Sequence, residues 1–170
     1  MDALECIMSR RSIRKYKLQQ APADVVQKVV EAGFAAPSAH NQRPCHFIII
    51  DDRDILNKIA EVNQHAKMLA AASFAVAICF DDTPKVVPGL VIDDCSAAAE
   101  NMLLAANALG YGSVWVGIHH DEVKQKNAKA ALKVPDGVKI TSIIAVGISD
   151  ETPAPRSKAA NPKVIHKNVW

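Results

Sequence analysis

The residues best suited to do chemistry stand near the start of the chain, at positions 10–16, which read Arg-Arg-Ser-Ile-Arg-Lys-Tyr. Guanidinium groups donate paired hydrogen bonds to oxyanions, so three arginines and a serine hydroxyl that converge could hold a phosphate. The alternative is a solvated basic turn, because runs of charge usually face water. The residues by themselves leave both interpretations open.

A second polar segment covers residues 37–44, which read Pro-Ser-Ala-His-Asn-Gln-Arg-Pro. Its hydroxyl, amide and guanidinium donors would suit the edge of a planar heterocycle that carries carbonyl groups and ring nitrogens. The alternative is a capped loop in which Ser38 and Asn41 satisfy backbone groups. These two interpretations also stay open.

Several other kinds of site are unsupported by the sequence. Gly110 and Gly112 lack a third glycine at dinucleotide spacing, and no Gly-Lys-Ser/Thr triplet is present, so neither a Rossmann site nor a P-loop is expected. The histidines show no metal-ligand pattern, since His119 and His120 are adjacent and would point to opposite faces of a strand. Cys45 beside a histidine is too common an arrangement to indicate a Cys-His hydrolase. We expect no metal and no catalytic side chain.

Composition restricts the partners and the compartment. A chain of 170 residues suits one domain, a net charge of +2 is too small to favour nucleic acid, and 5% aromatic residues offer few stacking platforms. The four cysteines contain no Cys-x-x-Cys pair, which favours reduced thiols. The start of the chain does not resemble a signal peptide, and the apolar run 68–80 is shorter than the about 20 residues that cross a bilayer. We expect a cytoplasmic protein with no membrane partner.

Hydrophobic spacing predicts a layered α+β or α/β domain in which helices surround a central sheet. Helices are expected over residues 2–9, 22–36, 53–72, 90–109 and 121–132, the third of them in two pieces around Val62-Asn63-Gln64. Strands are expected over residues 45–50, 73–80, 111–118 and 139–147. The alanine-rich helix 90–109 should be buried, either centrally or in a subunit interface, and Gly110 should end it. The proline-rich end of the chain is either disordered or an arm on another subunit, and Val164, Ile165 and Trp170 favour the arm.

Five segments in order resemble the nitroreductase family of FMN-dependent oxidoreductases. Residues 10–16 resemble its opening motif, and residues 36–44 its second motif. The central helix around Asn101-Met102-Leu103-Leu104-Ala105-Ala106 and the strand Gly110-Tyr111-Gly112-Ser113-Val114-Trp115-Val116-Gly117 are similar to the next two. Val146-Gly147 with a basic tail ending Val164-Ile165-His166 matches the close. The resemblance covers nearly the whole chain.

The resemblance implies an α+β sandwich with a central, mainly antiparallel sheet flanked by helices, in an intertwined homodimer that holds two FMN molecules at its interface. Residues 1–152 would form the FMN-binding domain. Residues 153–170 would be an extended C-terminal arm of the same domain, packed on the partner subunit.

The resemblance also assigns cofactor-binding residues. One group would meet the flavin phosphate and ring edge: Arg10, Arg11, Ser12 and Arg14, with Arg156 and Lys158 returning to the phosphate. A second group would approach from the partner subunit: Pro37, Ser38, Ala39 and Asn41. Val116 and Gly117 would line the ring with backbone groups, and Gln64 and Lys67 would lie near its pyrimidine edge.

The implied reaction is transfer of hydride from NADH or NADPH to the flavin N5 atom, then to a nitroaromatic, a quinone or a similar small molecule, in a ping-pong cycle. The alternative is a flavin-binding carrier or sensor without reductase turnover. A basic interaction domain for phosphorylated partners would rest on residues 10–16 alone. Three features depart from the family pattern: Cys45 stands where Trp is common, Lys158 where Arg is common, and the connector 81–88 is short, which implies an open pocket.

Overall fold

A four-stranded antiparallel sheet forms the centre of the protein. The computed structural model describes residues 1–154 and 161–170. The strands lie in the order β1-β2-β4-β3, and each neighbouring pair is antiparallel. Their bounds are β1 His46–Ile50, β2 Phe74–Asp81, β3 Gly112–Gly117 and β4 Val138–Gly147. The predicted α+β class and antiparallel sheet are therefore confirmed.

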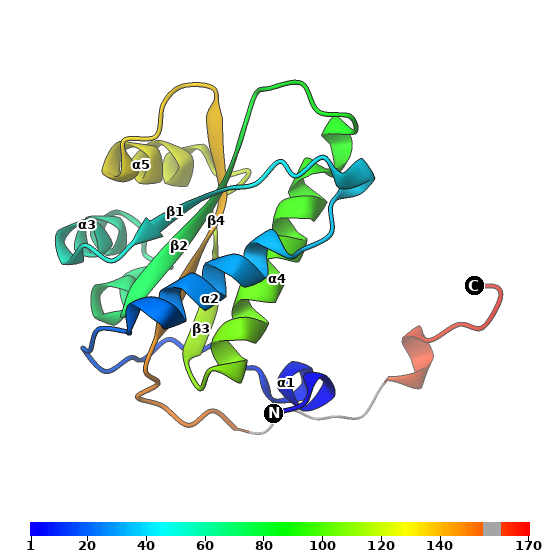
Figure 1. Ribbon diagram of the computed structural model, residues 1–170, viewed down its shortest axis with the longest axis horizontal. Helices are drawn as coiled ribbons and strands as arrows, with labels where there is room; N and C mark the ends of the chain where they lie inside the picture. Colours follow the sequence, from blue (N-terminus) through cyan, green and yellow to red (C-terminus); the bar gives the residue numbers. More distant parts are fainter. Residues whose placement is uncertain (155–160) are drawn as a thin grey trace.

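Helices cover both faces of this sheet (Figure 1). Helices α2 (Ala23–Phe34) and α4 (Val91–Ala108) pack on one face, and α3 (Arg53–Val62) and α5 (Glu122–Leu132) pack on the other. The alternation of side chains along a strand explains why two cores form. In β2, Phe74, Val76 and Ile78 join the core under α2 and α4, whereas Ala75, Ala77 and Cys79 join the opposite core.

The helix boundaries agree closely with those expected from the sequence. α1 spans Ala3–Ser9 behind an Asp2 N-cap, and Gly110 follows α4 in the left-handed conformation (φ +81°). The expected break within residues 53–72 is present, but the second piece, Lys67–Ala71, is a 3-10 helix. Asn63 ends α3, and its side-chain oxygen accepts a hydrogen bond from the backbone N–H of His65 (3.0 Å), which turns the chain before the short helix.

The basic segment 10–16 lies along the free edge of β3. The N–H of Ile13 donates to the carbonyl oxygen of Ser113 (2.9 Å), and the hydroxyl of Tyr16 donates to the carbonyl oxygen of Ile13 (2.7 Å). Gly112 permits this close approach, because a Cβ atom there would lie 2.7 Å from the Ile13 side chain. Backbone pairing therefore holds the segment against the sheet.

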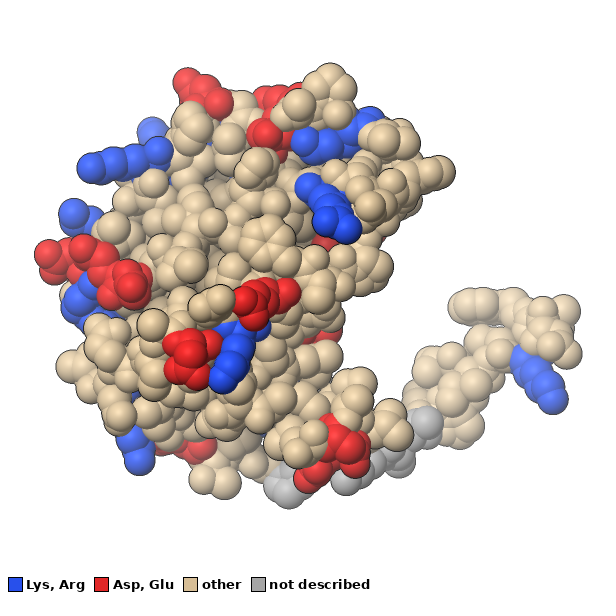
Figure 2. Space-filling view, in the orientation of Figure 1, with Lys and Arg blue, Asp and Glu red and all other residues tan. Residues whose placement is uncertain are grey.

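The last residues extend away from the body of the protein (Figures 1 and 2). Residues 161–170 are exposed along their length, and Trp170 is 99% exposed. Arg156 and Lys158 lie outside the described residues. No helix among the described residues is long and apolar enough to cross a membrane.

Candidate functional site

A cavity of about 600 Å³ opens beside the end of β3. Five residues singled out in the sequence line it together, although they come from distant segments: Arg14, Gln64, Lys67, Val116 and Gly117. His65, Met68, Val114, Trp115 and Lys124 complete the lining. The fold thus joins the basic segment, the turn after α3, the end of β3 and the start of α5 around one space.

The end of β3 presents backbone to this cavity. Val114 and Val116 are buried in the sheet, whereas Trp115 and Gly117 are exposed. A Cβ atom built on Gly117 would meet nothing within 4 Å, so the space above this residue is open. A flat ligand could therefore approach the strand closely at this point.

The cavity is cationic. Arg14, Lys67 and Lys124 line it, and none of the lining residues is a carboxylate. Asp121 lies behind Lys124, with its carboxylate 3.1 Å from the ammonium group. The backbone N–H of Lys124, followed by its ammonium group, lowers the pKa of Asp121. Three cations around an open strand end suit an anionic or electron-rich planar ligand.

Glu151 fixes the backbone that carries Arg14. Its carboxylate accepts hydrogen bonds from the backbone N–H groups of Arg14 and of Lys15, the second at 3.1 Å. The bond from Arg14 lowers the pKa of Glu151, because it stabilises the charged carboxylate. The segment after β4 therefore helps to position the basic segment.

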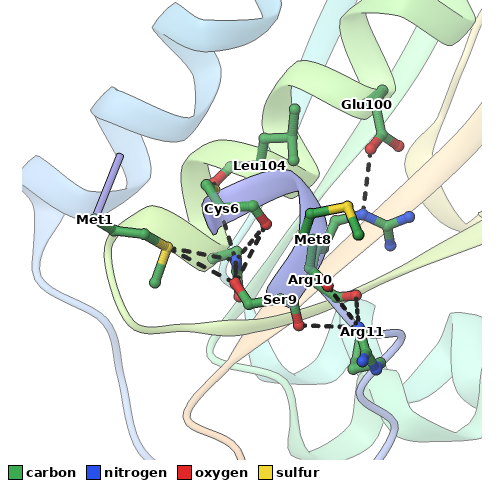
Figure 3. A network of polar contacts seen from close by, with 9 residues as sticks. Met1, Cys6, Met8, Ser9, Arg10, Arg11, Glu100 and Leu104 are labelled. Carbon is green, nitrogen blue, oxygen red and sulfur yellow. Dashed lines mark hydrogen bonds and ion pairs between the residues drawn. The ribbon is translucent and has the colours of Figure 1, made fainter. Parts of the chain in front are cut away.

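Arg10 and Arg11 make contacts with α4 and with the end of α1 (Figure 3). The guanidinium group of Arg10 lies 3.2 Å from Glu100 on α4. Nη1 of Arg11 donates to the carbonyl oxygens of Met8 (3.1 Å), Ser9 (3.2 Å) and Arg10 (2.8 Å), so this side chain caps the end of α1. Ser12 forms an isolated backbone bridge with Ser113. These three residues do not line the cavity, and their contact with a phosphate stays a prediction.

The second polar segment lies apart from this cavity. Pro37 and Ser38 line a different cavity, of about 160 Å³, between the loop and the start of α4. Ala39 and Asn41 belong to a short 3-10 helix in the same loop. A single chain therefore places the two groups of predicted site residues in two separate places.

Asp94, which is buried on α4, holds this loop through hydrogen bonds to Ala39 and Gln42, a contact that we call the clasp. Its carboxylate accepts the backbone N–H of Ala39 (2.8 Å) and the side-chain amide of Gln42 (2.7 Å). Gln42 also bonds to the backbone of Val87, both as a donor (3.2 Å) and as an acceptor (2.9 Å). The loop, the connector before α4 and α4 itself are thereby joined through two side chains.

The clasp holds a loop whose backbone is strained. His40, Asn41 and Arg43 all adopt positive φ angles, of 49°, 55° and 44°, which side chains disfavour. The hydroxyl of Ser38 accepts the N–H of Arg43 (3.0 Å), and the amide oxygen of Asn41 accepts from the Arg43 guanidinium group (2.8 Å). Ser38 thus caps the loop as the alternative interpretation expected, whereas Asn41 bonds to a side chain.

Sequence reasoning missed several of these residues. Lys124 and His65 gave no signal, because an isolated cation on a surface helix and a histidine in a turn are ordinary. Asp94 did give a signal in the sequence. It is a carboxylate in an alanine-rich helix that is expected to be buried, and a buried carboxylate must find hydrogen-bond donors. Gln42 lay inside the singled-out loop but was not assigned a role.

The structure is an α+β fold in which a cationic cavity lies beside the open end of β3. A family model described as Nitroreductase family matches residues 7–73 and 63–148 of the chain. The chain therefore belongs to the nitroreductase family.

Individual proteins agree with this membership. A protein of Methanothermobacter thermautotrophicus, provisionally named NADH dehydrogenase/NAD(P)H nitroreductase, is 38% identical over all of this chain and 88% of its own length. A crystal structure from Parabacteroides distasonis with the same provisional name is 35% identical and covers 98% of each chain, with a TM-score of 0.90. A structure from Clostridium difficile, titled FMN-dependent nitroreductase, is 29% identical, covers 98% of this chain and 99% of its own, and has a TM-score of 0.90.

The clasp gives a direct test of stability. Asp94→Asn should destabilise the protein by about 1–3 kcal/mol, because the amide NH2 group cannot accept the second hydrogen bond and leaves one half-buried donor unpaired. Asp93→Asn is the matched control, since the exposed Asp93 lies beside Asp94 in the same first helical turn. Urea unfolding measures both variants, and equal stabilities would contradict the role of the clasp.

Proposed function

We propose that the chain is an FMN-dependent oxidoreductase that transfers hydride from NADH or NADPH to nitroaromatic, quinone or similar acceptors in a ping-pong cycle. The observation that carries the proposal is the cavity in which Arg14, Gln64, Lys67, Val116 and Gly117 meet. The names of family relatives support it, since they include an NADPH-flavin oxidoreductase of Vibrio harveyi, 25% identical, and the FMN-dependent nitroreductase of Clostridium difficile.

The lining of the cavity suits FMN. The isoalloxazine ring is planar, and the open space above Gly117 would admit it against the backbone of β3. The amide of Gln64 can both donate to and accept from the polar edge of the ring, and the ammonium group of Lys67 can donate to it. When bound, FMN supplies the N5 atom that accepts and releases hydride, so no protein nucleophile or acid is required.

The cations have a further role in this proposal. Two-electron reduction adds negative charge to the pyrimidine side of a flavin, and Arg14, Lys67 and Lys124 would stabilise that charge in a partly enclosed site. We assign the phosphate to Arg10, Arg11 and Ser12 together with Arg156 and Lys158. Arg10 would then have to leave Glu100 or bind the phosphate with its remaining donors.

We also propose that the enzyme acts in the cytoplasm as a homodimer in which residues 153–170 pack on the partner. One chain holds Pro37, Ser38, Ala39 and Asn41 away from the cavity at β3, so these residues could complete a flavin site only on a second copy. The exposed Val164, Ile165 and Trp170 give the end of the chain an apolar surface that a partner could bury.

Light scattering should give the dimer a mass of about twice 18.3 kDa. Ile165→Ser and Trp170→Ser should raise the fraction of monomer, because they remove apolar area that the interface would bury. Lys167→Ser, which changes an exposed polar residue in the same segment, is the control. A monomeric wild-type protein would contradict the shared site.

Turnover is tested with the purified protein under anaerobic conditions. We expect about one FMN per chain, loss of the oxidised flavin absorption when NADH or NADPH is added, and its return when a quinone is added. Parallel lines in double-reciprocal plots would support the ping-pong cycle. Flavin that neither nicotinamide reduces would support the carrier or sensor instead, and a protein that takes up no FMN would refute both.

The cavity residues are tested by flavin affinity. Arg14→Ala and Lys67→Ala should each weaken FMN binding roughly 10- to 100-fold, the equivalent of the about 1.5–3 kcal/mol of a hydrogen bond to a charged group. Lys58→Ala, which removes an exposed cation from α3 outside the cavity, should leave binding unchanged. Quenching of flavin fluorescence gives the dissociation constants. Wild-type affinity in both cavity variants would place the flavin elsewhere.

A further inference from the structure

Two cysteines meet at the base of the clasped loop. The Sγ atoms of Cys45 and Cys95 lie 3.5 Å apart, although the residues are 50 positions apart in the sequence. Cys45 follows the loop directly, before β1 begins, and Cys95 lies on α4 next to Asp94. Both are free thiols in the structure. The contact between the loop and α4 therefore contains both the clasp and a pair of thiols.

We propose that Cys45 and Cys95 form an oxidative modification site, at which hydrogen peroxide converts the two thiols into an intramolecular disulfide. A disulfide bond is about 2.05 Å long, so the sulfur atoms must approach by about 1.5 Å. Cys45 lies in an irregular segment between the loop and β1, where such a shift breaks no ladder hydrogen bond.

A small oxidant can reach Cys45. This residue is half-buried and lines the 160 Å³ cavity together with Arg43, Asp94 and residues of the loop. That volume is several times larger than the volume of one water molecule in the liquid, which is about 30 Å³. Cys95 is 1% exposed and lies behind Cys45. The geometry makes Cys45 the residue that meets peroxide and Cys95 the residue that resolves it.

The pKa values of the two thiols differ in the direction that also makes Cys45 the residue that reacts with peroxide. The sulfur–sulfur hydrogen bond with Cys95 lowers the pKa of Cys45, whereas the same contact, followed by burial, raises the pKa of Cys95. Burial of Cys45 and the carboxylate of Asp94 act against this lowering, because both disfavour the thiolate.

The other two cysteines are less suited to react with peroxide. Cys79 is buried in β2 on the opposite side of the sheet, and burial raises its pKa to about 12. Cys6 is the buried residue of α1 and donates its S–H to the carbonyl oxygen of Leu104 on α4 (3.2 Å). Oxidation should therefore be selective for the pair at the loop.

The chemistry balances with one molecule of peroxide. The Cys45 thiolate attacks one peroxide oxygen, the O–O bond breaks, and a sulfenic acid and hydroxide form. The Cys95 thiol then attacks the Cys45 sulfur, the S–O bond breaks, and water leaves with the thiol proton. Two thiols are oxidised and one peroxide is reduced to two molecules of water. If the proposed function holds, dioxygen that oxidises the reduced flavin would be a local source of peroxide.

The test uses the full-length reduced protein and added hydrogen peroxide, so its outcome does not depend on bound flavin. The chain should lose two of its four thiols, lose the mass of two hydrogen atoms, and regain both with dithiothreitol. Peptide mapping of the oxidised wild-type protein should join Cys45 to Cys95 within one chain.

Variants identify the role of each sulfur. Cys45→Ser should abolish the thiol loss, and Cys95→Ser should stop at a sulfenic acid that dimedone traps. Cys6→Ala and Cys79→Ala are controls that should keep the bridge. Four thiols that persist in the wild type, a gain of oxygen without a bridge, a bridge to Cys6 or Cys79, or a bridge between chains would each overturn the proposal.

Discussion

The backbone pairing of β3 is the constraint on which the site depends. On one side β3 pairs with β4, whose residues are buried along nearly its whole length, and on the other side it pairs with Ile13. The first pairing fixes the strand in the sheet, and the second places the basic segment beside the strand end. Backbone hydrogen bonds set both the position of β3 beside β4 and the position of Ile13 beside β3. The position of Arg14 relative to Val116 therefore follows from the register of the sheet rather than from side-chain packing.

A second constraint acts on the loop between α2 and β1, outside this cavity. The buried carboxylate of Asp94 holds a loop whose backbone is locally unfavourable, since three of its residues take left-handed conformations. Hydrogen bonds to a buried charge can offset such strain, and they keep the loop in one conformation. The Cys45–Cys95 contact lies one residue from this clasp, so the loop is tied to α4 by both polar and sulfur contacts.

The separation of the two sets of site residues is informative about assembly. The cationic cavity and the clasped loop lie in different places on one chain, and the apolar C-terminal segment has no cover within the described residues. A flavin site shared between two copies, as proposed, would use all three features.

The sequence by itself determined the elements and the family. Hydrophobic periodicity located the helices and strands within a few residues, because core-facing positions repeat at the period of each element. The order of five motifs identified the nitroreductase family, which the comparisons confirmed. Tertiary structure alone decided which cations share a cavity. Of the three arginines in the basic segment, Arg11 caps a helix, Arg10 pairs with Glu100 and Arg14 reaches the cavity. Lys124 lines the same cavity as Arg14 although the two residues are more than a hundred positions apart in the sequence. Their proximity depends on long-range packing, which local sequence patterns do not predict.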